Sequence, residues 1–289
     1  MATYTAGQIV GLSRYRLKSA RPPGLVGSRW IVETDEAPGE RLADVVAATD
    51  EEVQDLCANA EALCDVTESP FVVNTLEAGW PADDIYLQVI DLGALARPIA
   101  ELYPDGGVSA ADLWKCAMDM VTGLVHLHRR EIVHGTLSPY TIYKDVDHLR
   151  IGELWWGHTA DQAPYHRDLA KRIPDCWPIQ FLPFMAPEIL SGAPPSRESD
   201  VYALGAVFYF LLTGKPPRQV DTMASRNDLR SALSGVPIKP IEITHPDTPA
   251  TTAGLIYEML EDDIGARPNI LMLEAIVRHK NGLDDGDSD

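Results

Sequence analysis

The sequence predicts an α+β protein in which a small mixed lobe is followed by a larger helical lobe, and three observations lead to this prediction. Short apolar runs separated by turns fill the N-terminal part of the chain, a pattern typical of β-strands. One helical pattern interrupts them, and helical patterns dominate the remainder. A chain of 289 residues, of which 45% are hydrophobic, is also long enough to bury a substantial core.

The N-terminal strands are predicted by four apolar runs, namely Tyr15–Leu17, Trp30–Val32, Phe71–Val73 and Ile85–Ile90. The helix among them is predicted by apolar residues that recur on one helical face: Val53, Leu56, Ala60 and Leu63. A small sheet that carries one helix is therefore expected in this region.

Two strong helix signals follow. Ser109 starts an S-x-x-D signal, and the helix after it buries an apolar stripe that runs from Leu113 to His128. Asp200 is expected to cap a second helix, which is apolar nearly all round and ends at Gly214. A helix of this kind belongs in the middle of a large core.

The domain organisation follows from these elements. Two further helices are predicted at 254–260 and 268–279, the second with a proline in its first turn. The small lobe is expected to span 1–91 and the larger lobe 92–280. The acidic residues 281–289 are expected to form a disordered tail.

The charge balance limits the partners. With 43 acidic and 24 basic side chains, the formal net charge is −19. Nucleic acids and anionic membranes are bound through basic surfaces, so neither is an expected partner. The simplest interpretation is a solvated acidic surface, and the alternative is that this surface binds a partner with a basic surface.

Cysteine spacing and hydropathy indicate a cytoplasmic protein. The four cysteines form no C-x-x-C pair, so they are expected to be reduced thiols and not metal ligands. Residues 1–9 lack the basic and apolar parts of a secretory signal. The longest apolar stretch, Val201–Leu212, is shorter than the roughly 18 residues that a membrane span needs.

Several short motifs occur in a fixed order along the second part of the chain. They are L-H-R-R-E-I-V-H-G-T-L-S-P-Y-T-I at 127–142, L-R-I-G-E-L-W at 149–155, M-A-P-E at 185–188, D-V-Y-A-L-G at 200–205, L-L-T-G-K-P-P at 211–217 and G-A-R-P at 265–268. In order and spacing, from about Leu113 to His279, they resemble the protein kinase family, in particular the bacterial-type Ser/Thr kinases. The resemblance implies the bilobal kinase fold.

The resemblance also implies that the residues of phosphoryl transfer are missing. Transfer in this family needs a carboxylate near the acceptor hydroxyl, a phosphate-binding lysine and two magnesium ligands. The corresponding positions hold Asp44 for the strand lysine, Thr136 for the H-R-D aspartate, Ser138 for the loop lysine, Thr141 for the metal-binding asparagine and Glu153 for the D-F-G aspartate. Glu153 alone keeps a carboxylate that could hold magnesium.

The phosphate loop and its helix are altered in the same way. The Gly-rich loop of the family aligns with Ser19, Arg21, Gly24 and Val26, and Pro22 and Pro23 fall inside it. Proline has no N–H for a phosphate cradle. Glu61 is the candidate for the helix glutamate, without a lysine to pair with.

The segment between Glu153 and Glu188 is rich in tryptophan and proline, including Trp155. These side chains are expected to pack the cleft shut, and the alternative is that they form a protein-binding surface. Its position for the threonine at the substrate site holds Phe181. Thr159 is the only Ser or Thr in the segment, so regulation by phosphorylation is not expected.

Residues that build the architecture of the family are retained. Ile90 and Asp91 match the gatekeeper and the hinge acid. The remaining structural positions are His134 in the internal spine, Glu188 and Arg267 as an ion pair, and Asp200 as the anchor of the catalytic loop.

The sequence therefore predicts a pseudokinase that binds another protein as a scaffold or allosteric regulator, without phosphotransfer and without a required cofactor. Binding of ATP and magnesium is left open but not favoured. The alternative is a noncanonical kinase or transferase that uses Glu153 for metal. A third hypothesis is a purely structural domain with one constitutive partner.

Overall fold

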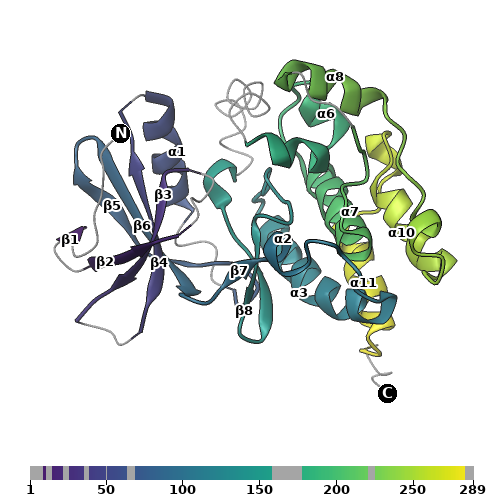
Figure 1. Ribbon diagram of the computed structural model, residues 1–289, viewed down its shortest axis with the longest axis horizontal. Coiled ribbons are helices and arrows are strands. Elements are labelled where there is room, and N and C mark those ends of the chain that lie inside the picture. Colours follow the sequence, from purple (N-terminus) through teal and green to yellow (C-terminus); the bar gives the residue numbers. More distant parts are fainter. Residues whose placement is uncertain are drawn as a thin grey trace.

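The computed structural model of the chain describes 9–10, 15–21, 26–35, 39–49, 51–63, 69–157, 178–220 and 225–283. Within these residues a lobe built on a β-sheet lies beside a larger helical lobe (Figure 1). Three groups of residues for which the sequence makes a prediction lie outside the described part: Pro22, Pro23 and Gly24 of the phosphate loop, 158–177 of the Trp- and Pro-rich segment, and the acidic 284–289.

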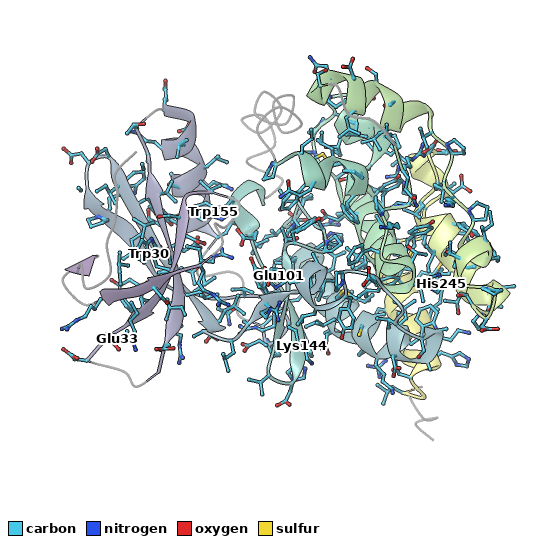
Figure 2. The ribbon with its side chains drawn as sticks, in the orientation of Figure 1. Trp30, Glu33, Glu101, Lys144, Trp155 and His245 are labelled. Atoms are coloured by element: carbon cyan, nitrogen blue, oxygen red, sulfur yellow. The ribbon has the colours of Figure 1, made fainter. Side chains whose placement is uncertain are left out.

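The small lobe is an antiparallel sheet with the strand order β1-β2-β3-β4-β6-β5. Its strands are β1 (Ile9–Val10), β2 (Tyr15–Ala20), β3 (Ser28–Glu33), β4 (Arg41–Ala47), β5 (Thr75–Ala82) and β6 (Ile85–Gly93). The predicted strands at Tyr15–Leu17, Trp30–Val32 and Ile85–Ile90 are confirmed as parts of β2, β3 and β6. Figure 2 shows Trp30 within this sheet.

One strand prediction in this lobe was wrong. Phe71–Val73 is not a strand, because Val72 forms only an isolated parallel bridge with Ile151. It is apolar because Val72 and Val73 are buried. The sequence also missed the edge strand β5, whose side chains are mostly half-exposed and whose Gly79 and Pro81 are unusual in strands.

Helix α1 (Glu51–Ala62) confirms the helix predicted in this lobe. Leu56, Ala60 and Leu63 are buried, as their spacing predicts. The helix contacts the short 3-10 turn η2 (Leu154–Trp156), which follows the strand at His148–Ile151.

The larger lobe consists of helices and a small three-stranded sheet. The helices are α2 (Ile99–Leu102), α3 (Ala110–Arg129), α6 (Pro187–Leu190), α7 (Arg197–Thr213), α8 (Arg226–Gly235), α9 (Ile241–Thr244), α10 (Ala250–Met259) and α11 (Ile270–Lys280), with 3-10 turns η4 (Ile179–Phe184) and η5 (Ile264–Ala266). The sheet has the order β7 (Arg97–Pro98), β8 (Ile142–Asp145) and β9 (His148–Ile151).

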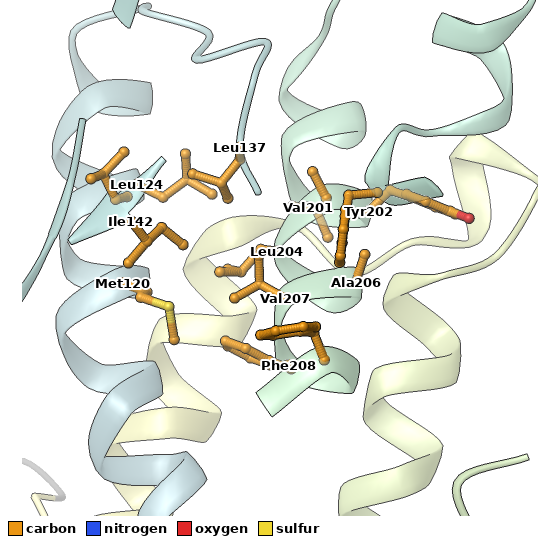
Figure 3. Packing of buried hydrophobic residues seen from close by; sticks show 14 of the residues in the cluster. Met120, Leu124, Leu137, Ile142, Val201, Tyr202, Leu204, Ala206, Val207 and Phe208 are labelled. Atoms are coloured by element: carbon orange, nitrogen blue, oxygen red, sulfur yellow. The ribbon is translucent and has the colours of Figure 1, made fainter. Parts of the chain in front are cut away.

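Helix α7 runs through the centre of this lobe and is buried from Ser199 to Leu212. Figure 3 shows its side chains Leu204 and Val207 facing Met120 of α3. The predicted all-round apolar core helix is thus confirmed. Among the described residues, no helix combines the length and the hydropathy of a membrane-spanning segment.

The predicted helix starts are partly right. Ser109 caps α3 by accepting a hydrogen bond from the amide of Asp112, as the S-x-x-D signal predicts. Asp200, however, does not cap α7, because Ser196 does so through the amide of Ser199. Asp200 lies in the first turn and is free to bind elsewhere. Helix α11 begins at Ile270, two residues after Pro268, because Asn269 provides the cap.

Candidate functional site

The loop that follows α3 is held by Asp200. Its two carboxylate oxygens accept hydrogen bonds from the backbone amides of His134 and Gly135, both at 2.8 Å. The Nε2 atom of His128 lies 2.9 Å from Oδ2 of the same carboxylate. The buried start of α7 is thereby connected to the loop at 133–141, where the family places its catalytic residues.

The protonation states of Asp200 and His134 follow from this burial. Burial alone would raise the pKa of Asp200, but the hydrogen bond and charge of His128 hold it below its usual value. Burial lowers the pKa of His134, so its ring is neutral. Its Nε2–H donates to the carbonyl of Gly152 at 2.9 Å, and Nδ1 accepts from the amide of Thr136.

The three hydroxyl residues of this loop are buried and hydrogen-bonded within the protein. Thr136, Ser138 and Thr141 are each at most 1% exposed. The Thr141 hydroxyl accepts from the amide of Ser138 at 2.9 Å and lies 3.2 Å from the carbonyl of Thr136. The Thr136 hydroxyl lies 3.2 Å from the carbonyl of Glu153. No carboxylate stands at the position of the H-R-D aspartate.

Aromatic side chains surround the position at which the family has its substrate-site threonine. Phe181 is 5% exposed, and its ring centroid lies 5.0 Å from that of Tyr140. The ring centroid of Phe184 lies 6.2 Å from that of Tyr140, and the two rings are nearly perpendicular. The side chain at the position of the substrate-site threonine is therefore part of an aromatic cluster.

In the cleft between the lobes, Asp44 is paired with Arg29. The two residues are direct cross-strand neighbours on β3 and β4. The guanidinium binds the carboxylate through two parallel hydrogen bonds, Nε to Oδ1 at 2.7 Å and Nη2 to Oδ2 at 2.6 Å. The acid that replaces the strand lysine thus has a cation from the adjacent strand.

Glu153 completes this cluster from the side of the larger lobe. Its Oε1 accepts from Arg29 Nη2 at 2.6 Å and from the Tyr143 hydroxyl at 2.5 Å. Its Oε2 accepts from the indole N–H of Trp155 at 3.1 Å. Trp155, labelled in Figure 2, is buried. Both oxygens of the carboxylate that could hold magnesium are therefore hydrogen-bonded by this chain.

The cluster is buried and formally carries one negative charge, because one guanidinium faces two carboxylates. The side chains of Arg29, Asp44 and Glu153 are 6%, 2% and 3% exposed. Burial raises the pKa of Asp44 to about 6, against the lowering effect of Arg29 and with a further raising effect of Glu153. Burial would lower the pKa of Arg29, but the two acids outweigh it and raise it well above its usual value.

The residues present do not fit magnesium and ATP. The cavity at this cluster has a volume of about 30 Å³, whereas small-molecule sites typically enclose about 300–1,000 Å³. In the part of the chain that the structure describes, no three His, Cys, Asp or Glu side chains converge on a metal position. An anionic cluster would also repel a triphosphate.

Sequence reasoning missed Arg29 and Tyr143 and misplaced the helix glutamate. Glu61 is exposed, and Ala60 lines the cavity in its place. The helical spacing of buried residues already put position 60, not 61, on the inner face of α1. The signal for Arg29 was the lone acid at position 44, since a buried acid needs a cation.

Glu188 and Arg267 form a bidentate ion pair, with Nη1 to Oε1 at 2.6 Å and Nη2 to Oε2 at 2.9 Å. The Arg267 side chain is fully buried and also donates to the carbonyls of Glu198 and Glu261. The pair predicted from the sequence is therefore present. It joins α6 to the segment before α11.

The Asp44 carboxyl gives a pH prediction. The pKa of Asp44 is higher in the folded chain than in the unfolded chain, so the folded chain binds a proton at this carboxyl more tightly. Protonation of Asp44 therefore stabilises the fold. This stabilisation is complete below about pH 4 and is lost as the pH rises through about 6. We expect the free energy of unfolding of the wild-type chain, relative to that of Asp44→Asn, to fall between these values. Denaturant unfolding of both chains from pH 4 to 7 measures it. Parallel pH profiles for the two chains would contradict the assignment.

The comparisons with known proteins show the family of the chain. The family model for the protein kinase domain matches residues 44–280. The serine/threonine-protein kinase AtPK2/AtPK19 of Arabidopsis thaliana is 26% identical over 74% of this chain and 42% of its own length. The Aurora/IPL1-related protein kinase 2 of Caenorhabditis elegans is 26% identical over 73% of this chain and 62% of its own length.

A third relative, the inactive serine/threonine-protein kinase PLK5 of Mus musculus, is 31% identical over 52% of this chain and 23% of its own length. The chain thus spans less than two thirds of the length of each of these relatives. The matched domain covers most of the chain, and both lobes have the expected architecture. The chain belongs to the protein kinase family.

Proposed function

We propose that this chain is a pseudokinase, which does not transfer phosphate and acts by binding another protein as a scaffold or allosteric regulator. One observation carries the proposal: the position of the catalytic base holds Thr136, whose buried hydroxyl lies against the carbonyl of Glu153. A hydroxyl cannot take up the proton of an acceptor at neutral pH. General acid–base catalysis alone typically contributes about 10²–10⁴-fold.

The other changes act in the same direction. Ser138 provides no positive charge beside a transferring phosphate, and Thr141 has its oxygen bound within the loop. Electrostatic stabilisation of phosphoryl transfer is often a larger effect than base catalysis. Such losses are not additive, but together they bring transfer close to background.

Protein binding is supported by what the chain retains. Asp200 and the pair of Glu188 with Arg267 keep the architecture of the larger lobe intact. The excess of acidic side chains favours a partner with a basic surface. One relative is an inactive kinase by its name, while the other relatives reported above are named as kinases, so the proposal depends on the residues of this chain. A cytoplasmic setting is part of it.

A second candidate function is a noncanonical transferase. Two observations favour it: Arg29 supplies a cation at the phosphate end of the cleft, and Glu153 retains a carboxylate. This enzyme would need Glu153 to exchange its present donors for a metal ion.

A labelling assay tests the proposal. We expect no transfer of γ-phosphate from Mg·ATP or Mn·ATP to the chain or to basic protein substrates above the level of a heat-denatured sample. Autoradiography or intact-mass analysis measures it, with an active kinase as the positive control. Labelling by the native chain that is lost in Glu153→Gln would overturn the proposal in favour of the transferase.

Affinity capture at two salt concentrations tests the partner. Since the Debye length falls from about 10 Å at 0.1 M to about 3 Å at 1 M salt, a basic partner should be retained at low salt and released at high salt. A partner that is acidic, or that remains bound regardless of salt, would contradict the electrostatic part of the proposal.

A further inference from the structure

We propose that Arg29 is a built-in ligand of the cleft, which fastens the two lobes to each other and excludes nucleotide. This inference deepens the proposed function, because it depends on a cleft that is not used for phosphotransfer.

The guanidinium of Arg29 connects the lobes directly. Arg29 is on β3 of the small lobe, and four of its five N–H groups donate to three partners. Asp44 belongs to the same lobe, whereas Tyr143 on β8 and Glu153 after β9 belong to the other side of the cleft. A single buried side chain thus has charged or polar partners on both lobes.

The contacts to the larger lobe form a closed triangle. Arg29 Nη1 donates to the Tyr143 hydroxyl at 2.5 Å, and that hydroxyl donates to Glu153 Oε1 at 2.5 Å. Arg29 Nη2 donates to the same Oε1 at 2.6 Å. The carboxylate is held on its other oxygen by Trp155, whose ring packs on Tyr86 of β6. In a buried site such a network is strong only while every member keeps its partner.

A second buried arginine crosses the cleft in the opposite sense. Arg150 on β9 is 7% exposed and donates to the backbone carbonyls of Val72 and Asp91, which belong to the small lobe and the hinge. It also pairs with the carboxylates of Asp91 at 3.3 Å and Asp145 at 3.2 Å. The lobes are therefore fastened at two positions by side chains from opposite sides.

Apolar side chains fill the space between these arginines. Leu42, Ile90 and Leu92 of the small lobe form one buried cluster with Tyr143 of the larger lobe. All four are at most 6% exposed. Together with the salt-bridge network they leave the cavity of about 30 Å³ described above, enough for one or two water molecules.

A nucleotide would have to disrupt this arrangement to enter. Its phosphates would compete with Asp44 and Glu153 for a guanidinium that is already neutralised by them. The two carboxylates, once released, would face the phosphates with like charge. Burial would make each unpaired group costly. We therefore infer that Mg·ATP does not bind and that the lobes keep a fixed arrangement.

Calorimetric unfolding of the wild-type full chain is the first test and needs no variant. We expect one transition in which both lobes unfold together, unchanged within about 1 °C by 5 mM ATP or ADP with or without Mg²⁺. A nucleotide at about 100 times its dissociation constant would raise the midpoint by about 5 °C or more. Such a rise would overturn the inference.

Substitution of Arg29 is the second test, and Lys18 provides the matched control. Lys18 is also on the small sheet and pairs with Glu33 and Glu40, but about 40% of its side chain is exposed. We expect Arg29→Met to lower the midpoint by about 6 °C or more and to separate the transitions of the lobes. Lys18→Met should shift the midpoint by no more than about 4 °C. Equal effects of the two variants would contradict the proposal that Arg29 fastens the two lobes to each other.

Arg29→Lys distinguishes the contribution of the branched guanidinium group from that of its positive charge. Lysine keeps the positive charge but cannot make two parallel bonds to Asp44 while donating to Tyr143 and Glu153. We expect an intermediate midpoint, and a midpoint equal to that of the wild type would show that charge alone suffices and overturn the proposed network. If Arg29→Met does not fold, the nucleotide titration of the wild type still decides.

The outcomes separate this inference from the proposed function. A nucleotide-induced rise of the unfolding midpoint without phosphate labelling would overturn the proposed role of Arg29 and leave the pseudokinase assignment intact. Phosphate labelling would overturn the assignment whatever the effect of Arg29→Met.

Discussion

Asp200→Ala is expected to destabilise the chain by at least about 3 kcal/mol. The carboxylate is 1% exposed and accepts hydrogen bonds from the amides of His134 and Gly135 and from the ring of His128. Removal of the acceptor leaves the buried donors of His134 and His128 and the half-buried amide of Gly135 without this partner, and each buried donor left unpaired costs about 1–3 kcal/mol. Urea unfolding followed by circular dichroism measures the loss.

Ser196→Ala is the matched control, because Ser196 is the residue that caps α7. Loss of a helix cap costs about 1 kcal/mol. If Asp200 acted only as a helix-terminus residue, the two variants would be equally destabilised. A difference below about 1 kcal/mol would therefore refute the role of Asp200 as the anchor of the loop.

The pH dependence gives a second readout on Asp200. Because its pKa is held below the usual value in the folded state, its stabilising effect is present above the usual carboxyl pKa and is lost as the pH falls below it. Asp200→Asn removes this titration. The stability difference between the wild type and Asp200→Asn should therefore shrink in acid.

The contacts of the larger lobe could be predicted because they join short motifs of recognisable composition. Glu188 and Arg267 lie far apart in sequence, but each is part of a motif, and the pair has the geometry that the motifs imply. The burial of α7 was predictable from composition alone, since no polar face interrupts it.

The cleft could not be predicted to the same depth, because its contacts depend on strand register. Arg29 contacts Asp44 because the register of β3 and β4 places these two residues opposite each other. A shift by one residue would place Arg29 on the other face of the sheet. The sequence contained both charges but no local pattern that specified the pairing.

The cap of α7 was assigned to the wrong residue for a related reason. Asp200 and Ser196 are both good capping residues, and the choice between them depends on which one has a stronger partner elsewhere. Asp200 is drawn to the amides of His134 and Gly135, so Ser196 caps the helix. Tertiary hydrogen bonds decided between two locally similar alternatives.

Arg267→Ala is expected to cost about 3–5 kcal/mol, the range for breaking a buried ion pair by removal of one partner. The guanidinium binds both oxygens of Glu188, donates to the carbonyls of Glu198 and Glu261, and lies 5.0 Å from the ring centroid of Tyr202. Its loss leaves the Glu188 carboxylate, only 14% exposed, without a cation.

Arg267→Lys separates the contribution of the bidentate geometry from that of the positive charge. Arg129→Ala is the control for an exposed ion pair. Lysine keeps the charge but loses the bidentate geometry, so Arg267→Lys should retain only part of the stability. Arg129 pairs with Glu274 while 65% of its side chain is exposed, and its removal should change stability by no more than about 1 kcal/mol. Denaturant unfolding ranks the three variants. Since Glu188 lies in the first turn of α6, amide exchange at 188–190 should also rise in Arg267→Ala. Unchanged exchange there would mean that the pair does not hold this segment in place.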